Sequence, residues 1–113
     1  MHELSLWESR LDGIEDTARR EGFTQVRVVR LEVGQFAGVE LSALRFGFEA
    51  VKPGTLAQDA RLEIEQTPGT AWCFDCEKTV TLEDRLSPCP LCGGGRVQPS
   101  GGTDIKIRDL EVL

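Results

Sequence analysis

Four cysteines within a stretch of twenty residues constrain this chain more than any other feature. They are Cys73, Cys76, Cys89 and Cys92, which form the pattern C-x2-C-x12-C-x2-C. In a reducing compartment two such pairs favour a metal ion over disulfides. The only histidine of the 113 residues is His2, so no imidazole lies near the cysteines in sequence. The pattern therefore predicts one metal ion held by four thiolates.

Zinc is the metal that this spacing most often binds, and tetrahedral four-thiolate zinc sites are usually structural. A module of about thirty residues buries too little apolar surface to be stable alone, so we expect metal binding and folding to be coupled. Four-thiolate sites also accept iron. Cys89-Pro90-Leu91-Cys92-Gly93 resembles a rubredoxin knuckle, whereas Glu77 follows the first pair where rubredoxins usually have a small residue. Zinc is the prediction, and an iron–sulfur or rubredoxin-like iron site is the alternative.

Two helices are predicted from apolar residues that recur at intervals of three and four. The first helix covers residues 4–21, and its apolar stripe consists of Trp7, Leu11, Ile14 and Ala18. The second covers residues 41–51 and ends at Lys52-Pro53-Gly54. We expect Phe48 to lie in the core, whereas Phe46, on another helix face, fits either the core or a partner surface.

Three strands are predicted from alternating apolar residues. In residues 24–33 the alternation changes phase between Val28 and Val29, which fits a bulge or a strand buried on different faces at its two ends. Residues 105–112 change phase in a similar way, so we expect these two strands to be neighbours. Residues 61–65 form the third strand, with the leucine and the isoleucine pointing inward.

The cysteines lie between two of these strands, and this position predicts the architecture. The fold class is α/β: two helices with a small mixed sheet of about three strands, plus an inserted zinc-ribbon-like module. Residues 70–99 form the four-cysteine module, and residues 1–69 and 100–113 form the α/β domain. Ser100-Gly101-Gly102 is expected to be a flexible joint.

Charge and hydropathy exclude several classes of function. The chain has 13 basic and 19 acidic residues, and the four-cysteine module itself holds four acidic and three basic ones. Neither has a surplus of cations for phosphates, so we expect no nucleic acid partner. No apolar run approaches the roughly 20 residues that cross a bilayer, and no signal peptide pattern opens the chain. We expect a cytoplasmic protein without membrane association. It is not expected to be an enzyme, because a closed four-thiolate site has no position for a water and no other cysteine–histidine pair exists.

The start of the chain offers a second metal site. His2 fits either a solvated terminal histidine or a metal ligand. The α-amine of Met1, the backbone nitrogen of His2 and its imidazole can chelate one ion, and the Glu3 backbone nitrogen or carboxylate can supply a fourth donor. Such square-planar, nitrogen-rich coordination suits Ni(II) or Cu(II). The positive pole of the first helix favours the deprotonated nitrogens that this chelate needs.

These features together resemble the HypA/HybF family of hydrogenase nickel-incorporation proteins. The resemblance covers the full chain in order. It rests on Met1-His2-Glu3-Leu4-Ser5, Leu31-Glu32-Val33-Gly34, Gly38-Val39, Leu44-Arg45-Phe46-Gly47-Phe48-Glu49, Leu62-Glu63-Ile64-Glu65, both cysteine pairs and Leu110-Glu111-Val112. Gln35-Phe36-Ala37 and Glu40-Leu41-Ser42 depart from many relatives.

The resemblance implies a nickel metallochaperone. It implies Ni(II) as transient cargo on Met1, His2 and Glu3, so that residues 1–69 and 100–113 form a nickel-binding domain. It also implies structural Zn(II) on the four cysteines, a HypB-type GTPase as companion, and delivery to the large subunit of [NiFe]-hydrogenase. In some relatives the urease pathway is served as well.

Two other classes of function compete with this one. A zinc-ribbon adaptor would bind protein or nucleic acid and use no second metal. A rubredoxin-like electron carrier would hold iron and be coloured. Both a monomer and a homodimer are compatible with the sequence.

Overall fold

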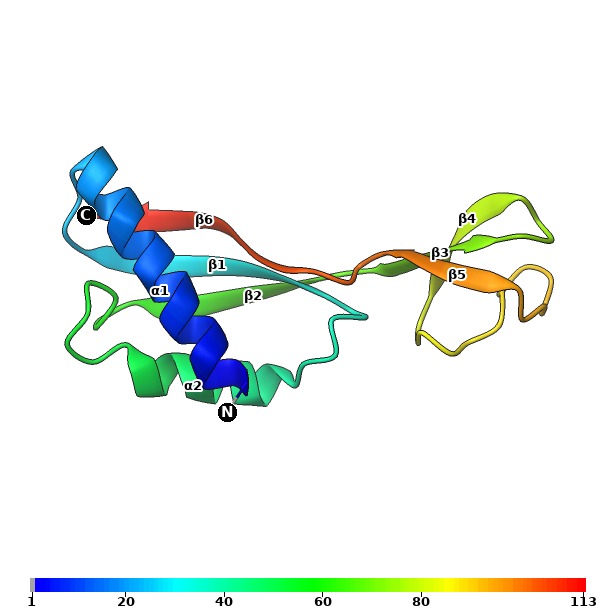
Figure 1. Ribbon diagram of the computed structural model, residues 1–113, viewed down its shortest axis with the longest axis horizontal. Helices are drawn as coiled ribbons and strands as arrows, with labels where there is room; N and C mark the ends of the chain where they lie inside the picture. Colours follow the sequence, from blue (N-terminus) through cyan, green and yellow to red (C-terminus); the bar gives the residue numbers. More distant parts are fainter. Residues whose placement is uncertain (1) are drawn as a thin grey trace. The chain divides into compact units, whose positions relative to one another are not determined.

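The computed structural model describes residues 2–113, with the side chain of His2 excepted. Its elements are α1 (His2–Glu21), β1 (Val26–Gly34), α2 (Leu41–Val51), β2 (Arg61–Thr67), β3 (Gly69–Cys73), β4 (Lys78–Leu82), β5 (Val97–Gly101) and β6 (Ile105–Val112) (Figure 1). Within the described residues, no helix combines the length and the apolar character that a membrane crossing requires.

The strands form two sheets of three, in the orders β2-β1-β6 and β4-β3-β5. Strand β1 pairs with β6, so the prediction that these two strands are neighbours is confirmed. The cysteines lie in sequence between β2 and β6, which belong to one sheet. The fold class is thereby confirmed: two helices, a small three-stranded sheet and an inserted cysteine module.

The chain forms two compact units. Unit 1 comprises the described residues of Met1–Arg30, Val39–Glu63 and Ile107–Leu113, and unit 2 comprises Leu31–Gly38 and Ile64–Lys106. This division into units does not show which part of the chain binds a metal. The predicted functional domains, residues 1–69 with 100–113 and residues 70–99, therefore stay a prediction.

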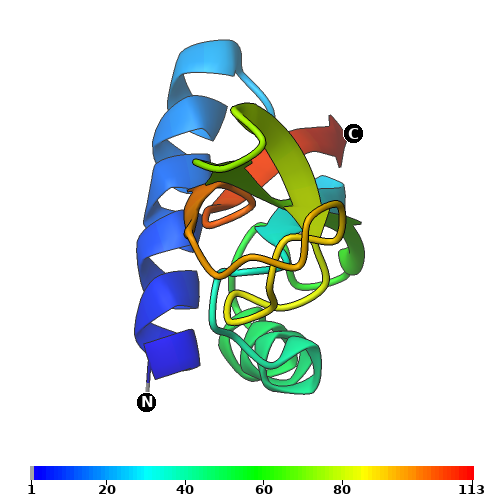
Figure 2. The same ribbon diagram turned by 90° about the vertical axis from the view of Figure 1, so that its right-hand side faces the viewer.

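In unit 1, α1 and α2 contact each other where they cross, near the start of α1 (Figures 1 and 2). The predicted stripe of α1 is buried, which confirms its amphipathic character. The indole nitrogen of Trp7 donates a hydrogen bond to the Leu44 carbonyl oxygen at 2.8 Å. The Trp7 and Phe48 ring centroids lie 4.9 Å apart. Phe46 is exposed, so it does not belong to the core.

Strand β1 is buried on both phases. Its buried valines and leucine are Val26, Val28, Val29, Leu31 and Val33. The predicted change of phase is thus confirmed as burial of both sets of side chains. In β2, Leu62 and Ile64 are only half-buried, because β2 lies at the edge of its sheet.

A charged cluster crosses the strands of unit 1 at Arg30 of β1. Its guanidinium pairs with Glu63 of β2 at 3.1 Å. On β6 it pairs with Asp109 at 2.8 Å and with Glu111 at 3.1 Å. Glu63 is therefore a half-buried partner of the central strand.

Strands β3 and β5 are absent from the sequence prediction, and the expected joint at residues 100–102 is wrong. Ser100 and Gly101 belong to β5, which pairs antiparallel with β3. Gly102 adopts a φ of 75° and approaches the backbone of Gly34 so closely that a Cβ on Gly34 would lie 2.1 Å from the Gly102 oxygen. These glycines allow a tight crossing of backbone segments, which side chains would block.

Candidate metal centre

Two turns of the same shape present the four sulfurs. Cys73 ends β3, and its carbonyl oxygen accepts a hydrogen bond from the Glu77 N–H at 2.8 Å. In the second turn the Cys89 carbonyl accepts one from the Gly93 N–H, also at 2.8 Å. The φ angles of Glu77 and Gly93 are 53° and 72°. The two knuckles therefore share the closing hydrogen bond and a residue of positive φ directly after the second cysteine.

The structure brings the four predicted cysteines together. One Sγ atom from each lies within 4.8 Å of all the others. The Sγ atoms of Cys73 and Cys92 are 3.7 Å apart, and those of Cys76 and Cys89 are 3.9 Å apart. A tetrahedral ion with metal–sulfur distances of about 2.3 Å separates its sulfurs by about 3.8 Å. The cluster therefore fits a four-thiolate metal ion such as zinc.

Backbone N–H groups support negative charge on the sulfurs. The N–H groups of Cys76, Leu91 and Gly94 donate to the Sγ atoms of Cys73, Cys89 and Cys92 respectively, each at 3.4 Å. Hydrogen bonds to an ionised acceptor are stronger than those between neutral groups. The turns are therefore arranged to stabilise thiolates.

Without a bound cation, the neighbouring cysteines differ in how readily they lose a proton, because they hydrogen-bond to one another. The backbone N–H of Cys92, together with that of Leu91, lowers the pKa of Cys89 to about 7 in spite of burial. The hydrogen bond with Cys92, followed by burial, raises the pKa of Cys76 to about 12. A divalent cation removes this difference, because it favours the thiolate form of every ligand.

The four sulfurs differ in burial, and a residue from elsewhere in the chain contributes to this. Cys73 and Cys89 are buried, whereas Cys76 is half-buried and Cys92 is exposed. Phe36, from the segment between β1 and α2, packs into the core that contains both buried cysteines. This role of Phe36 was missed by reasoning from the sequence. The one sequence feature that could have indicated this role is an aromatic residue between two glycines, Gly34 and Gly38.

The predicted nickel residues are placed unequally. Met1 lies outside the described residues, and His2 begins α1. Glu3 lies in the first turn of α1, packed against Gly47 of α2. A Cβ built on Gly47 would lie 3.0 Å from Cδ1 of Trp7 and 3.5 Å from Cβ of Glu3. Gly47 therefore sets how closely the first turn of α1 approaches α2, a role that sequence reasoning missed.

A small α/β unit with an inserted four-cysteine module defines a class of metal-binding protein. The model of one family, described as hydrogenase/urease nickel incorporation metallochaperone HypA, matches residues 1–112. The chain belongs to this HypA family, which confirms the resemblance found in the sequence. It is a metallochaperone of nickel incorporation in hydrogenase maturation, and its partners are accordingly hydrogenase-related.

Known relatives match over their full length. The hydrogenase maturation factor HypA of Beijerinckia indica is 59% identical over 113 residues, and that of Xanthobacter autotrophicus is 53% identical, each with 100% of both chains covered. The solution structure of the nickel metallochaperone HypA from Helicobacter pylori has a TM-score of 0.70 at 22% identity and covers 98% of this chain and 97% of its own. A second HypA solution structure has a TM-score of 0.73 at 24% identity, with coverages of 100% and 97%. These two structures share the fold.

Proposed function

We propose that the protein binds Ni(II) at Met1, His2 and Glu3 as transient cargo and delivers it to the large subunit of [NiFe]-hydrogenase. The donors are the Met1 α-amine, the His2 backbone nitrogen and imidazole, and the Glu3 backbone nitrogen or carboxylate. A HypB-type GTPase acts as the companion protein. The family match over residues 1–112 supports this assignment, and its description includes urease as a second destination of nickel.

The position of the helix start supports the ligand set. Because α1 begins at His2, the N–H groups of His2 and Glu3 belong to the first turn. First-turn N–H groups have no acceptor within their helix. Nickel can therefore replace these protons without breaking a helical hydrogen bond, and the positive pole of α1 lowers the cost of the deprotonated nitrogens.

The anchoring of this first turn is the observation that carries the proposal. Glu3 packs on Gly47, and one turn later Trp7 is fully buried and bonded to Leu44. A firmly packed first turn gives the adjoining nickel ligands a defined attachment to the rest of unit 1. Their donors come from neighbouring residues of a chain end, which suits release better than a buried cage does.

The four cysteines are proposed to hold structural Zn(II). The sulfur spacing fits a tetrahedral ion, and two of the four sulfurs are buried, which suits retention. When bound, zinc would cross-link the two knuckles. Residues 70–99 would then be the zinc module, and residues 1–69 with 100–113 the nickel-binding domain.

Substitution of His2 tests the nickel site. His2→Ala removes the imidazole and should abolish Ni(II) binding in calorimetric titrations of protein without a tag, while zinc content and the far-UV circular dichroism stay unchanged. Glu8→Ala, exposed on the same helix, should bind nickel as the wild type does. Wild-type nickel affinity in His2→Ala would falsify the site.

Two further measurements examine the amine and the delivery. An N-terminal extension blocks the Met1 amine and should weaken Ni(II) binding, and affinity should fall as the pH is lowered from about 8 to about 5, because loading releases protons. A flat pH profile contradicts the chelate. Transfer of nickel to the metal-free large subunit, with and without the GTPase, examines delivery, and sedimentation distinguishes monomer from homodimer.

A further inference from the structure

An exposed aromatic residue lies at the centre of one face of the sheet β4-β3-β5. Trp72 of β3 is opposite Thr79 of β4 and Gln98 of β5. Its neighbours along the strand, Ala71 and Cys73, are fully buried, so Trp72 points to the opposite face. Its side chain is 40% exposed, and that of Phe74, two residues further, is 45% exposed. Exposed side chains of this size on one face mark a candidate interaction surface.

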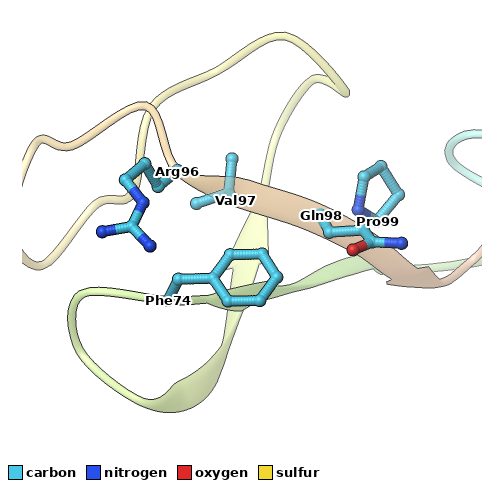
Figure 3. A pocket seen from close by; sticks show the side chains of 5 residues that line it. All are labelled: Phe74, Arg96, Val97, Gln98 and Pro99. Carbon is cyan, nitrogen blue, oxygen red and sulfur yellow. The ribbon is translucent and has the colours of Figure 1, made fainter.

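A pocket of about 440 Å³ adjoins this face. Its lining residues are Phe74, Arg96, Val97, Gln98 and Pro99 (Figure 3). Because Gln98 is opposite Trp72, the pocket and the exposed indole belong to one surface. We call this surface the aromatic face and define it by Trp72, Phe74, Thr79, Arg96 and Gln98.

The aromatic face already holds one guanidinium. The Arg96 guanidinium carbon lies 5.9 Å from the centroid of the Phe74 ring. The same guanidinium donates to the Asp75 carboxylate at 3.0 Å. The Phe74 ring and the Asp75 carboxylate thus show that a guanidinium fits against a ring on this face. Trp72 supplies a second ring, and indole is the strongest of the aromatic side chains in cation–π contacts.

The charge of the module favours a cationic ligand. Residues 70–99 hold four acidic and three basic side chains, and a four-thiolate zinc site, as proposed above, would add further negative charge. A negatively charged module attracts basic segments and repels phosphates and acidic peptides.

We propose that the aromatic face docks a basic segment of a partner protein. An arginine or lysine of that segment stacks on Trp72, while the Thr79 hydroxyl and the Gln98 amide bond to its backbone or polar side chains. Tryptophan is enriched among the residues that dominate interface energies. None of these residues belongs to the proposed nickel site, so the docking proposal does not depend on that site.

Fluorescence of the intact, zinc-loaded protein tests the proposal. The probes are a short peptide of alternating arginine and serine, the matched peptide with glutamate in place of arginine, and an oligothymidine. Trp7 is fully buried, so a change in emission on titration reports on Trp72. The arginine peptide should shift the emission to the blue and bind less tightly as salt is raised. The glutamate peptide and the oligonucleotide should not bind.

Substitutions of Trp72 and of a control residue test whether the peptide binds at Trp72. Trp72→Thr keeps a strand-forming residue and should weaken the arginine peptide at least about tenfold by calorimetry. Trp72→Tyr keeps a ring and should recover part of the loss. The control Leu86→Thr, at a side chain 90% exposed in the same unit, should change affinity less than about twofold. Nickel affinity should be the same in all three.

Several outcomes would overturn the proposal. They are equal or tighter binding of the glutamate peptide, binding of the oligonucleotide, absence of binding by the arginine peptide, and unchanged affinity in Trp72→Thr. Self-association that buries Trp72, seen by sedimentation, would assign the face to a second copy of the chain and would overturn it as well.

Discussion

The two compact units are stabilised by different means. The core of unit 1 contains large apolar side chains, with Trp7, Leu44 and Phe48 fully buried. In unit 2, the core cluster beside the sulfurs consists of six buried residues, and two of them, Cys73 and Cys89, are themselves members of the sulfur cluster. Burial of apolar surface is sufficient for the first unit. The second has a smaller core beside its sulfurs, so we expect a bound metal ion to supply much of its free energy of folding.

Removal of the metal should give the largest difference between the units. Chelation of zinc, or Cys89→Ser, should unfold unit 2, since structural zinc contributes about 10 kcal/mol or more in small modules. The helices of unit 1 should persist in far-UV circular dichroism, and amide exchange should become fast only in unit 2. Loss of α1 and α2 along with the metal would show that the units do not fold separately.

Substitution of Phe36 tests how much the apolar core contributes to unit 2, because Phe36 is the large apolar side chain of that core. Phe36→Ala should lower the free energy of unfolding of unit 2 by about 3 kcal/mol and speed zinc loss to a chelator. Phe46→Ala, at a side chain 66% exposed, should change stability by less than about 0.5 kcal/mol. Urea unfolding and the rate of zinc release measure both. Equal effects of the two variants would remove Phe36 from the account of zinc retention.

Gly47 concerns unit 1 alone and should have a smaller effect. Gly47→Ala gains roughly 1 kcal/mol of helix propensity but brings a Cβ to 3.0 Å from Trp7, which is buried and bonded. The two effects should nearly cancel in stability, while the displaced Glu3 should weaken Ni(II) binding. Gly13→Ala has open space and should stabilise α1 by roughly 0.5–1 kcal/mol with unchanged nickel affinity. If both variants gain stability equally and bind nickel normally, Gly47 does not position the first turn.

The smallest effect should come from acid acting on the Arg30 cluster. Arg30 holds the pKa of Asp109 below its ordinary 3.8, and Arg61, followed by Arg30, holds that of Glu63 below 4.5. Stability from these carboxylates is fully present above those ordinary values and is lost as the pH falls through the lower folded pKa values.

Arg30→Met should therefore raise the pKa of Asp109 toward 3.8 and change that of Glu63 less, since Arg61 remains. Carboxyl NMR titration measures both shifts, and Arg61→Met is the matched control with the opposite preference. An unchanged Asp109 pKa in Arg30→Met would contradict the role given to this ion pair.

The sequence predicted those features that depend on neighbours along the chain. The stripe of Trp7, Leu11, Ile14 and Ala18 gave α1 to within two residues at its start, and alternation gave β1, β2 and β6. The cysteine spacing predicted that four sulfurs come together, because the two cysteines of each pair lie in one short turn. The proposed nickel donors likewise belong to three consecutive residues.

Strands β3 and β5 were missed because their pairing is not local. Each has five residues, and glycine or proline occurs within them at Gly69, Pro99 and Gly101. Such residues predict turns when only the sequence is considered. Here Gly101 lies beside a shift of register between Thr70 and Ala71, and its partner strand lies about thirty residues away in sequence.

Residue types at fixed short spacings were enough to predict the periodic elements and the grouping of the four cysteines. Only the tertiary structure decided that Phe36 completes the core of the cysteine module, that Gly47 admits Glu3 against α2, and that Trp72 faces outward. These depend on close packing between distant segments, in which a single methyl group or a change of register decides what fits.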